Sequence, residues 1–185
     1  MAIKTFTAGS VLTASDTNTY LANSGLVYVT SATVGTGVSS VTVSNCFSST
    51  FTSYRLVATG ITATDEGSTS LQLTASGTPN TSGYYGALIF SGAGTLQNAT
   101  DTNNLAFGFI AANGNVAGVS LDVDIHQPFV ANKTWVANGA YMRYNYYGTY
   151  NGYNSAATSY DGFKLAPQSG TLTGGTITVY GYRKA

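Results

Sequence analysis

Most of the chain alternates apolar and polar residues in short runs and does not repeat them with helical spacing. Leu121, Val123 and Ile125 share one face of an extended strand, and the residues between them are polar. Ile177 and Val179 alternate with polar residues in the same way. Clusters of Gly, Asn and Ser separate such runs, which predicts an all-β fold of two antiparallel sheets packed face to face. A β-sandwich of jelly-roll type is favoured over an immunoglobulin-type sandwich, because a single cysteine excludes the Cys-Trp-Cys arrangement.

Three Asn-Gly dipeptides lie between or within these runs. Both residue types accept positive φ angles, so the dipeptide is typical of tight turns between antiparallel strands. We therefore expect hairpin turns at Asn113-Gly114, Asn138-Gly139 and Asn151-Gly152.

A stretch near the N-terminus departs from the β pattern. Thr13 and Asp16 have the spacing of a capping box, and Gly25 supplies a stop signal. A free helix of about ten residues is marginal in water, so we expect this one to dock on a partner. The sequence thus predicts an attachment segment with a short helix at residues 1–25 and a β-sandwich domain at residues 26–185. The expected docking residues are Phe6, Val11, Leu12, Asp16, Asn18, Tyr20 and Leu21.

Charge is scarce in this chain. Asp, Glu, Lys and Arg make up 8% of the residues, and seven acidic side chains balance seven basic ones. An ordinary globular protein has about 25% of such residues. Without a strong field to steer polyanions or anionic lipid, we expect neither nucleic acid nor membrane as a partner. The first residues also lack the apolar core of a secretory signal, which predicts synthesis in a cytoplasm without export by that route.

Two sets of residues resemble bacteriophage virion proteins. FTAGSVLTASDTNTYLANSG, at residues 6–25, is similar to a short segment that opens many phage tail and fibre proteins. FTSYRLVATGI, SLQL, SGYYGAL, LDVDI, NKTW and LAPQSGTLTGGTITVYGYRK then follow in the order expected of phage fibre-tip and head-fibre jelly-roll domains. The resemblance implies a homotrimeric appendage or decoration of the virion, which contacts other capsid or tail proteins through its N-terminal segment and displays the β-domain outward.

The resemblance leaves the position on the particle open. Fibres of this kind place a long repetitive shaft between attachment segment and tip, whereas only about Leu26 to Ser40 remains for one here. We expect a trimeric surface appendage, such as a short fibre, a spike or a tail-tip component, made in the host cytoplasm and released by lysis. A capsid decoration protein of cement or head-fibre type is the alternative. A carbohydrate-binding module for receptor recognition is a further alternative, with a host surface glycan as its ligand.

One strand carries a candidate metal site. Asp122, Asp124 and His126 are spaced by two residues, which puts two carboxylates and an imidazole on one face of the strand. A solvated outer strand face explains the same pattern, and no second run rich in ligands is present. We therefore expect no metal and no cofactor.

Catalysis has few candidate groups. A glycosidase needs two carboxyl groups about 5 to 10 Å apart. Asp65 and Glu66 fall in an expected loop, Asp101 and Asp161 are isolated, and His126 has no evident nucleophile partner. We therefore expect a protein that is not an enzyme.

The stretch from residue 141 to residue 160 contains seven tyrosines among Asn and Gly. We expect a long hairpin whose rings pack on one another or against neighbouring subunits. Sugar recognition is the alternative, because tyrosine combines a rigid ring with a hydroxyl group. Trp135 fits either a sheet-face residue or a sugar platform, and Cys46 a small buried residue. The expected receptor or subunit contacts are Tyr144, Tyr146, Tyr147, Tyr150 and Tyr153.

Overall fold

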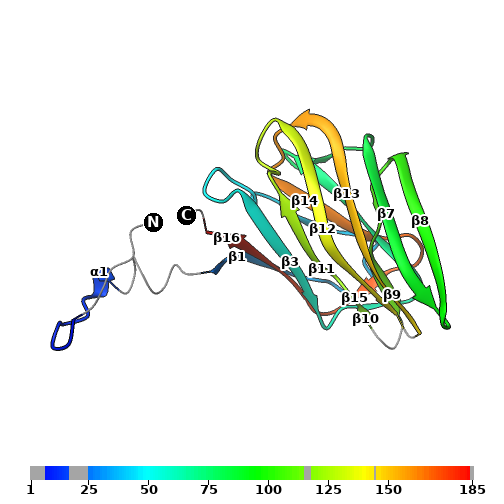
Figure 1. Ribbon diagram of the computed structural model, residues 1–185. Helices are drawn as coiled ribbons and strands as arrows, with labels where there is room; N and C mark the ends of the chain where they lie inside the picture. Colours follow the sequence, from blue (N-terminus) through cyan, green and yellow to red (C-terminus); the bar gives the residue numbers. More distant parts are fainter. Residues whose placement is uncertain (1–6, 17–24, 115–117, 144, 184–185) are drawn as a thin grey trace.

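The computed structural model describes residues 7–16, 25–114, 118–143 and 145–183. Within these ranges the protein is an antiparallel β-sandwich that follows a short helical segment, α1 (Ala14–Asp16) (Figure 1). No helix in the described ranges has both the length and the apolar character needed to cross a lipid bilayer.

The larger sheet contains eight strands, and every neighbouring pair in it is antiparallel. In the order in which they lie side by side, they are β1 (Leu26–Thr33), β16 (Thr176–Tyr182), β3 (Ser53–Thr59), β11 (Asp122–His126), β12 (Asn132–Arg143), β13 (Tyr146–Thr158), β7 (Tyr84–Gly92) and β8 (Thr95–Asn104).

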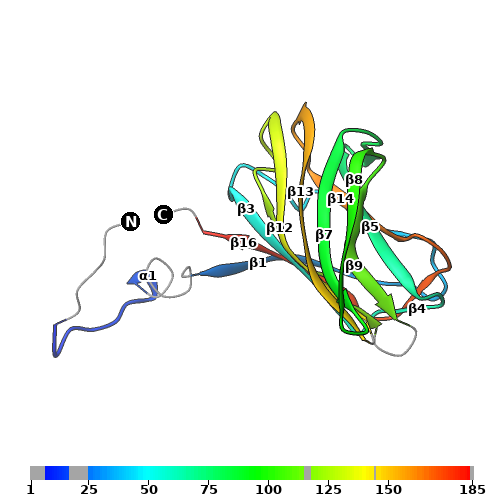
Figure 2. The ribbon, with the colours of Figure 1, turned by 45° about the vertical axis from the view of Figure 1, so that its right-hand side comes forward.

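The second sheet covers one face of the first (Figure 2). Its strands, in spatial order, are β10 (Gly118–Val119), β9 (Phe107–Gly114), β5 (Gly67–Ala75), β14 (Gly162–Pro167) and β2 (Val41–Val43), with β6 (Thr78–Pro79) paired to β5. A small third ladder joins β15 (Leu172–Thr173) to β4 (Thr62–Ala63).

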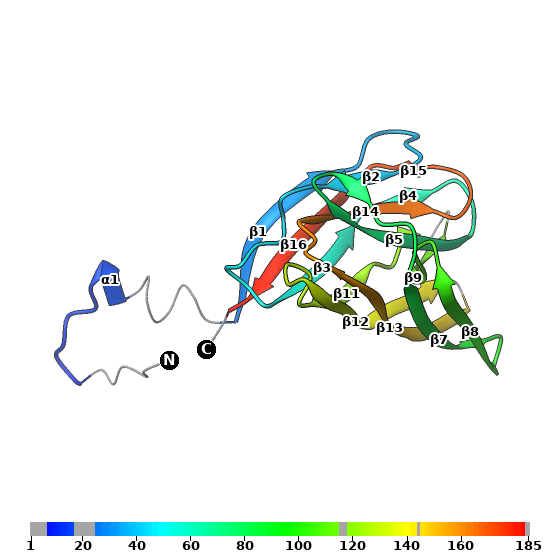
Figure 3. The same ribbon diagram turned by 90° about the horizontal axis from the view of Figure 1, so that it is seen from above.

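The strand order is that of a jelly roll. Eight strands of the sandwich, numbered along the chain, are β1, β2, β3, β5, β9, β11, β14 and β16. They are arranged 1-8-3-6 in the larger sheet and 2-7-4-5 in the smaller one. The view from above shows these two layers (Figure 3). The predicted all-β, antiparallel jelly-roll sandwich with a short N-terminal helical segment is therefore confirmed.

Two hairpins are inserted into this framework. The β7–β8 hairpin lies between β5 and β9 in the chain, and the β12–β13 hairpin lies between β11 and β14. Both add to the larger sheet beyond β11, where β13 of one hairpin pairs with β7 of the other. The larger sheet is therefore four strands wider than the jelly roll requires.

The core lies between the two sheets, and the alternating pattern assigns its residues correctly. Leu121, Val123 and Ile125 are at most 1% exposed, and Ile177 and Val179 are fully buried. Burial of each such side chain contributes about 1.5 to 3 kcal/mol, so the fold needs no disulfide to hold it. The largest fully buried side chains are Tyr54, Tyr84, Tyr150, Tyr160, Phe47, Phe107 and Phe163.

The expected turn at Asn113-Gly114 agrees with the structure, because Gly114 at the end of β9 pairs with Gly118 of β10. The other two Asn-Gly turns were wrong. Asn138 has a φ of 58° but lies inside β12, where the ladder to β13 shifts between Val136 and Gly139. The positive φ there forms a β-bulge. Asn151-Gly152 lies within β13, paired with β7 on its other side.

The capping box is confirmed at α1. The Thr13 hydroxyl accepts the backbone N–H of Asp16 at 3.1 Å, and the Asp16 carboxylate accepts the backbone N–H of Thr13 at 3.2 Å. Val11 is 82% exposed and Leu12 is 50% exposed. The remaining expected docking residues, Phe6, Asn18, Tyr20 and Leu21, lie outside the described residues.

The described ends of the β-domain meet at one corner of the sandwich. Leu26 at the start of β1 pairs with Tyr182 at the end of β16, and the backbone N–H of Arg183 donates to the carbonyl of Gly25 at 3.3 Å. The start of β1 and the end of β16 therefore lie side by side at this corner.

A buried thiol and buried tyrosine hydroxyl groups predict that the free energy of unfolding decreases at alkaline pH. Burial raises the pKa of the Cys46 thiol to about 12, and burial likewise raises the pKa of the Tyr84 and Tyr150 hydroxyl groups. Their unfolded pKa values are about 8.5 for Cys and about 10 for Tyr. The unfolded chain therefore loses these protons first, so stability is complete below about pH 8.5 and falls as pH rises beyond it.

We expect urea-unfolding free energies to be level from neutral pH to about pH 8.5 and then to decrease steadily. Part of the rise in absorbance at tyrosinate wavelengths, the part that comes from the buried Tyr84 and Tyr150, should occur only as the chain unfolds. The Cys46→Ala variant should lose the earliest part of the decrease. A stability that stays level well above pH 10 would contradict the assignment.

Candidate binding site

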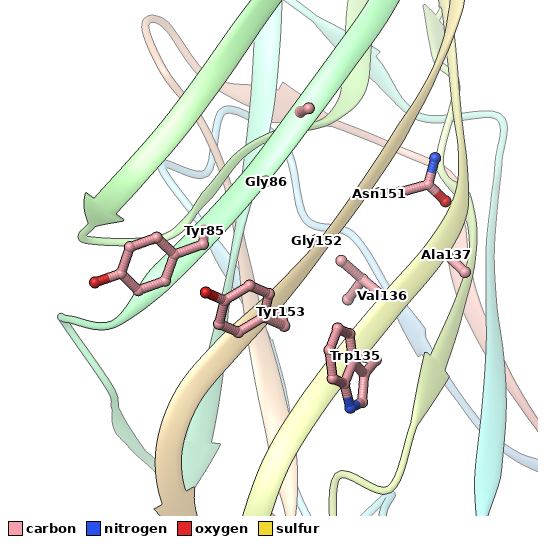
Figure 4. A pocket seen from close by; sticks show the side chains of 9 residues that line it. Tyr85, Gly86, Trp135, Val136, Ala137, Asn151, Gly152 and Tyr153 are labelled. Carbon is pink, nitrogen blue, oxygen red and sulfur yellow. The ribbon is translucent and has the colours of Figure 1, made fainter.

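Three aromatic side chains form a row across the outer face of the larger sheet. Trp135 of β12 lies opposite Tyr153 of β13, which lies opposite Tyr85 of β7. Trp135 and Tyr153 have ring centroids 5.2 Å apart and tilted by 46°, while Tyr153 and Tyr85 are 5.1 Å apart and nearly parallel at 14°. Figure 4 shows the three rings side by side, with both tyrosine hydroxyl groups pointing the same way. We call these residues the aromatic row.

A groove of about 480 Å³ lies along the aromatic row. Its lining residues are Tyr85, Gly86, Ala87, Trp135, Val136, Ala137, Asn151, Gly152 and Tyr153. Apart from the aromatic row, most of these residues are small. A molecule in the groove would therefore meet aromatic rings beside small side chains and backbone.

Packing beneath the groove requires its two glycines. A Cβ at Gly86 would collide with the hydroxyl group of Tyr150, which points into the sandwich below. A Cβ at Gly152 would collide with the carbonyl group of Tyr85 on the neighbouring strand. These glycines let β13 and β7 approach closely.

The groove carries no charge of its own, since none of its nine lining residues is Asp, Glu, Lys, Arg or His. One cation lies next to it: the Lys133 ammonium group is 5.1 Å from the centroid of the Tyr153 ring. That distance is within the range of a cation–π interaction. The groove therefore favours uncharged ligands, with a positive charge only at its edge.

Several hydrogen-bonding groups at the groove have no partner within the described part of the chain. They are the hydroxyl groups of Tyr85 and Tyr153 and the indole N–H of Trp135. The side-chain oxygen of Asn151 accepts the backbone N–H of Asn138 at 3.1 Å, which leaves its amide nitrogen facing no described partner. These groups are available to a ligand.

The tyrosine-rich stretch forms the expected hairpin, β12–β13, but its rings are divided between the two faces. Tyr147 is 61% exposed on the outer face, and Tyr153 belongs to the aromatic row. Tyr150 is fully buried, so its assignment to receptor or subunit contact is corrected. Tyr146 is partly buried, and its ring lies 6.0 Å from that of Phe90 and is tilted by 37°. Tyr144 lies outside the described residues.

Asp101, one of the carboxyl groups considered for catalysis, is held inside the sandwich. It is 3% exposed, and its side chain accepts the Tyr150 hydroxyl at 2.6 Å, the Gly108 backbone N–H at 2.7 Å and the Asn104 amide at 2.7 Å. The bond to Asp101 adds to burial in raising the pKa of Tyr150. The carboxyl group of Asp101 thus links β8 to β9 and β13, so its role is structural.

Asp122 and Asp124 share the outer face of β11 as predicted, and both face Arg55 of β3. The guanidinium donates to Asp122 at 2.8 Å and lies 3.8 Å from Asp124. Asp124 also accepts the Tyr182 hydroxyl at 2.6 Å. The hydrogen bond to Asp122 raises the pKa of Arg55 further above its ordinary value. The Arg55 guanidinium therefore balances the charge of this pair of carboxylates.

The remaining candidate groups are dispersed. His126 contacts Ser53 through Nδ1 at 2.9 Å, and Asp161 accepts the backbone N–H of Ser76 at 2.9 Å. Asp65 and Glu66 are exposed in a loop. Among the described residues, no group of three His, Cys, Asp or Glu side chains is placed to hold a metal ion.

Reasoning from the sequence missed Tyr85 and the glycines of the groove. The signal for Tyr85 was present, because SGYYGALIF alternates and puts Tyr85, Ala87 and Ile89 on the face opposite the buried Tyr84 and Leu88. What the pattern lacked was the pairing of β7 with β13, which places Tyr85 beside Tyr153. Comparisons of the chain with protein-family models, with curated proteins and with solved structures found no match.

Proposed function

We propose that this chain is a non-enzymatic structural protein of a bacteriophage particle, a short trimeric surface appendage attached through residues 1–25. The observation that carries the proposal is the contrast between the two parts of the chain. Residues 7–16 lie outside the sandwich with a formed capping box and exposed Val11 and Leu12, whereas the jelly roll is complete without them (Figure 1). Apolar side chains exposed beside a preformed cap suit docking into a groove of a partner protein.

The absence of catalysis in this proposal is supported by the carboxyl groups already engaged within the fold. Asp101 is enclosed by three hydrogen bonds, and Asp122 is paired with Arg55. A general acid or base needs a carboxyl group that can reach a substrate. Because these carboxyl groups are engaged, the outer surface of the jelly roll is better suited to binding another molecule than to catalysis.

Association of copies is supported by a second feature of the widened sheet. Ile89, Leu96, Met142 and Tyr147 project from β7, β8, β12 and β13 and are each more than half exposed. Exposed apolar side chains gathered on neighbouring strands are typical of surfaces that another protein covers. We propose that copies of the chain meet there in the trimer.

Deleting residues 2–24 should leave a folded jelly roll that no longer joins particles. The core described for the β-domain contains none of residues 7–16, so circular dichroism and the urea-unfolding transition should be retained. Particles produced with the truncated chain should lack it in gels of purified virions. A milder variant, Val11→Asp with Leu12→Asp, tests the same contact with the chain length unchanged. Normal incorporation of both variants would refute the attachment segment.

A capsid decoration protein is the alternative within the same particle. It would clamp shell subunits at a symmetry axis. The number of copies per particle separates the two roles. A decoration protein is present in a number of copies that follows the number of shell subunits, whereas a tail component is present in few copies. Electron microscopy of particles labelled at residue 185 would show head or tail directly.

A further inference from the structure

We propose that the groove beside the aromatic row binds an uncharged saccharide. This inference deepens the proposed display role by naming a ligand class for the exposed face of the jelly roll. Its test uses the isolated chain, so a failure to bind sugar and a failure to join particles are separate results.

The size of the groove suits a small ligand. Binding sites for small molecules have volumes of about 300 to 1,000 Å³, and this groove has about 480 Å³. It lies on the sheet face, where Trp135 is 47% exposed and Tyr85 and Tyr153 are partly exposed, and Figure 4 shows the three rings along it. An end or an exposed unit of a glycan chain can therefore enter without any movement of the sheet.

The groups around the groove match the two kinds of surface on a pyranose ring. A pyranose has an apolar face of C–H groups and a rim of hydroxyl groups. The aromatic row supplies apolar ring surface for the former. The hydroxyl groups of Tyr85 and Tyr153, the Trp135 indole N–H and the Asn151 amide nitrogen supply hydrogen bonds for the latter.

The aromatic row is also held in place before a ligand arrives. Each ring contacts the next at centroid distances near 5 Å, and the Lys133 ammonium group lies over Tyr153. Side chains ordered in advance lose little conformational entropy on binding.

Charge decides between uncharged and acidic glycans. The lining residues carry no charge, so the groove offers no partner for the carboxylate of an acidic sugar. Lys133 lies at the edge and is engaged with the ring of Tyr153. We therefore assign the site to neutral hexose or N-acetylhexosamine units.

The test uses the full chain and a glycan array that contains both neutral and acidic oligosaccharides. Trp135 is the single tryptophan of the chain, so its fluorescence reports occupancy of the groove directly. We expect neutral glycans on the array to bind and, in solution, to change the emission of Trp135. Tyr153→Ala and Tyr85→Ala should each weaken binding at least about tenfold.

Tyr28→Ala is the matched control, because Tyr28 is an exposed tyrosine of the same sheet, on β1, outside both the groove and the proposed contact between copies. It should bind as the original chain does. Ala87→Phe fills the groove without removing an aromatic ring and should abolish binding, with the unfolding midpoint of each variant confirming that it is folded.

Three results would overturn the proposal. The first is an array without binding. The second is binding only of acidic glycans that is lost in Lys133→Gln. The third is self-association of the chain that weakens in Tyr153→Ala, since the groove would then be a contact between copies.

Discussion

Asp101→Ala is expected to lower the free energy of unfolding by about 3 kcal/mol or more. The substitution removes the acceptor of three hydrogen bonds and leaves the Gly108 N–H and the Tyr150 hydroxyl without their partner inside the sandwich. Each buried group that loses its partner costs about 1 to 3 kcal/mol. Domains of this kind are stable by about 5 to 15 kcal/mol, so the loss is a large fraction of the total. Urea unfolding followed by circular dichroism measures it.

Asp122→Ala is the matched control for this prediction. It is the same substitution at a carboxylate that is paired with Arg55 on the sheet surface, where an ion pair contributes about 0 to 1 kcal/mol. Tyr150→Phe should cost less than Asp101→Ala, and the double variant should cost less than the sum, because both remove the same bond. Equal effects of Asp101→Ala and Asp122→Ala would contradict the structural task assigned to Asp101.

Gly175→Ala should be the most damaging of the glycine substitutions at turns. Gly175 precedes β16 with a φ of 76°, and a Cβ there would lie within 3 Å of backbone atoms of Thr59, Gly60 and Ile61. Backbone cannot move aside as a flexible side chain can. A left-handed conformation and the collision together should cost about 3 kcal/mol or more.

Gly94→Ala separates the cost of the left-handed conformation from the cost of the collision. Gly94 lies in the β7–β8 turn with a φ of 84°, and a Cβ there would meet nothing within 4 Å. It should therefore show only the conformational cost of about 1 kcal/mol. Thermal unfolding of the two variants measures the difference, and similar melting temperatures would show that residues 59–61 yield to the new methyl group.

The alternating pattern was enough to predict the class of fold and part of its core. Residues such as Val123 and Ile177 point inward because the pleat of a strand imposes a period of two. Turn positions were less predictable. The positive φ that Asn138 accepts serves a hairpin turn or a bulge equally well, and only the pairing with β13 decides between them.

The groove was out of reach of the sequence because its walls come from three strands. Trp135 and Tyr153 lie on the two strands of one hairpin, but Tyr85 comes from the other inserted hairpin, far away in the chain. Local patterns show which face a side chain occupies and do not show which strands are neighbours. For the same reason Asp122 and Asp124 were placed on one face correctly, while their partner Arg55 was not foreseen.

The corner where Gly25 meets Arg183 has a mechanical consequence. Because β1 lies antiparallel to β16, a pull on residues 1–25 along the strand, resisted by the body of the sandwich, loads the hydrogen bonds between these strands together, in shear. A pull between the two ends of the domain would instead open the same bonds one after another. Under the proposed attachment through residues 1–25, the jelly roll would bear tension in the more resistant of the two geometries.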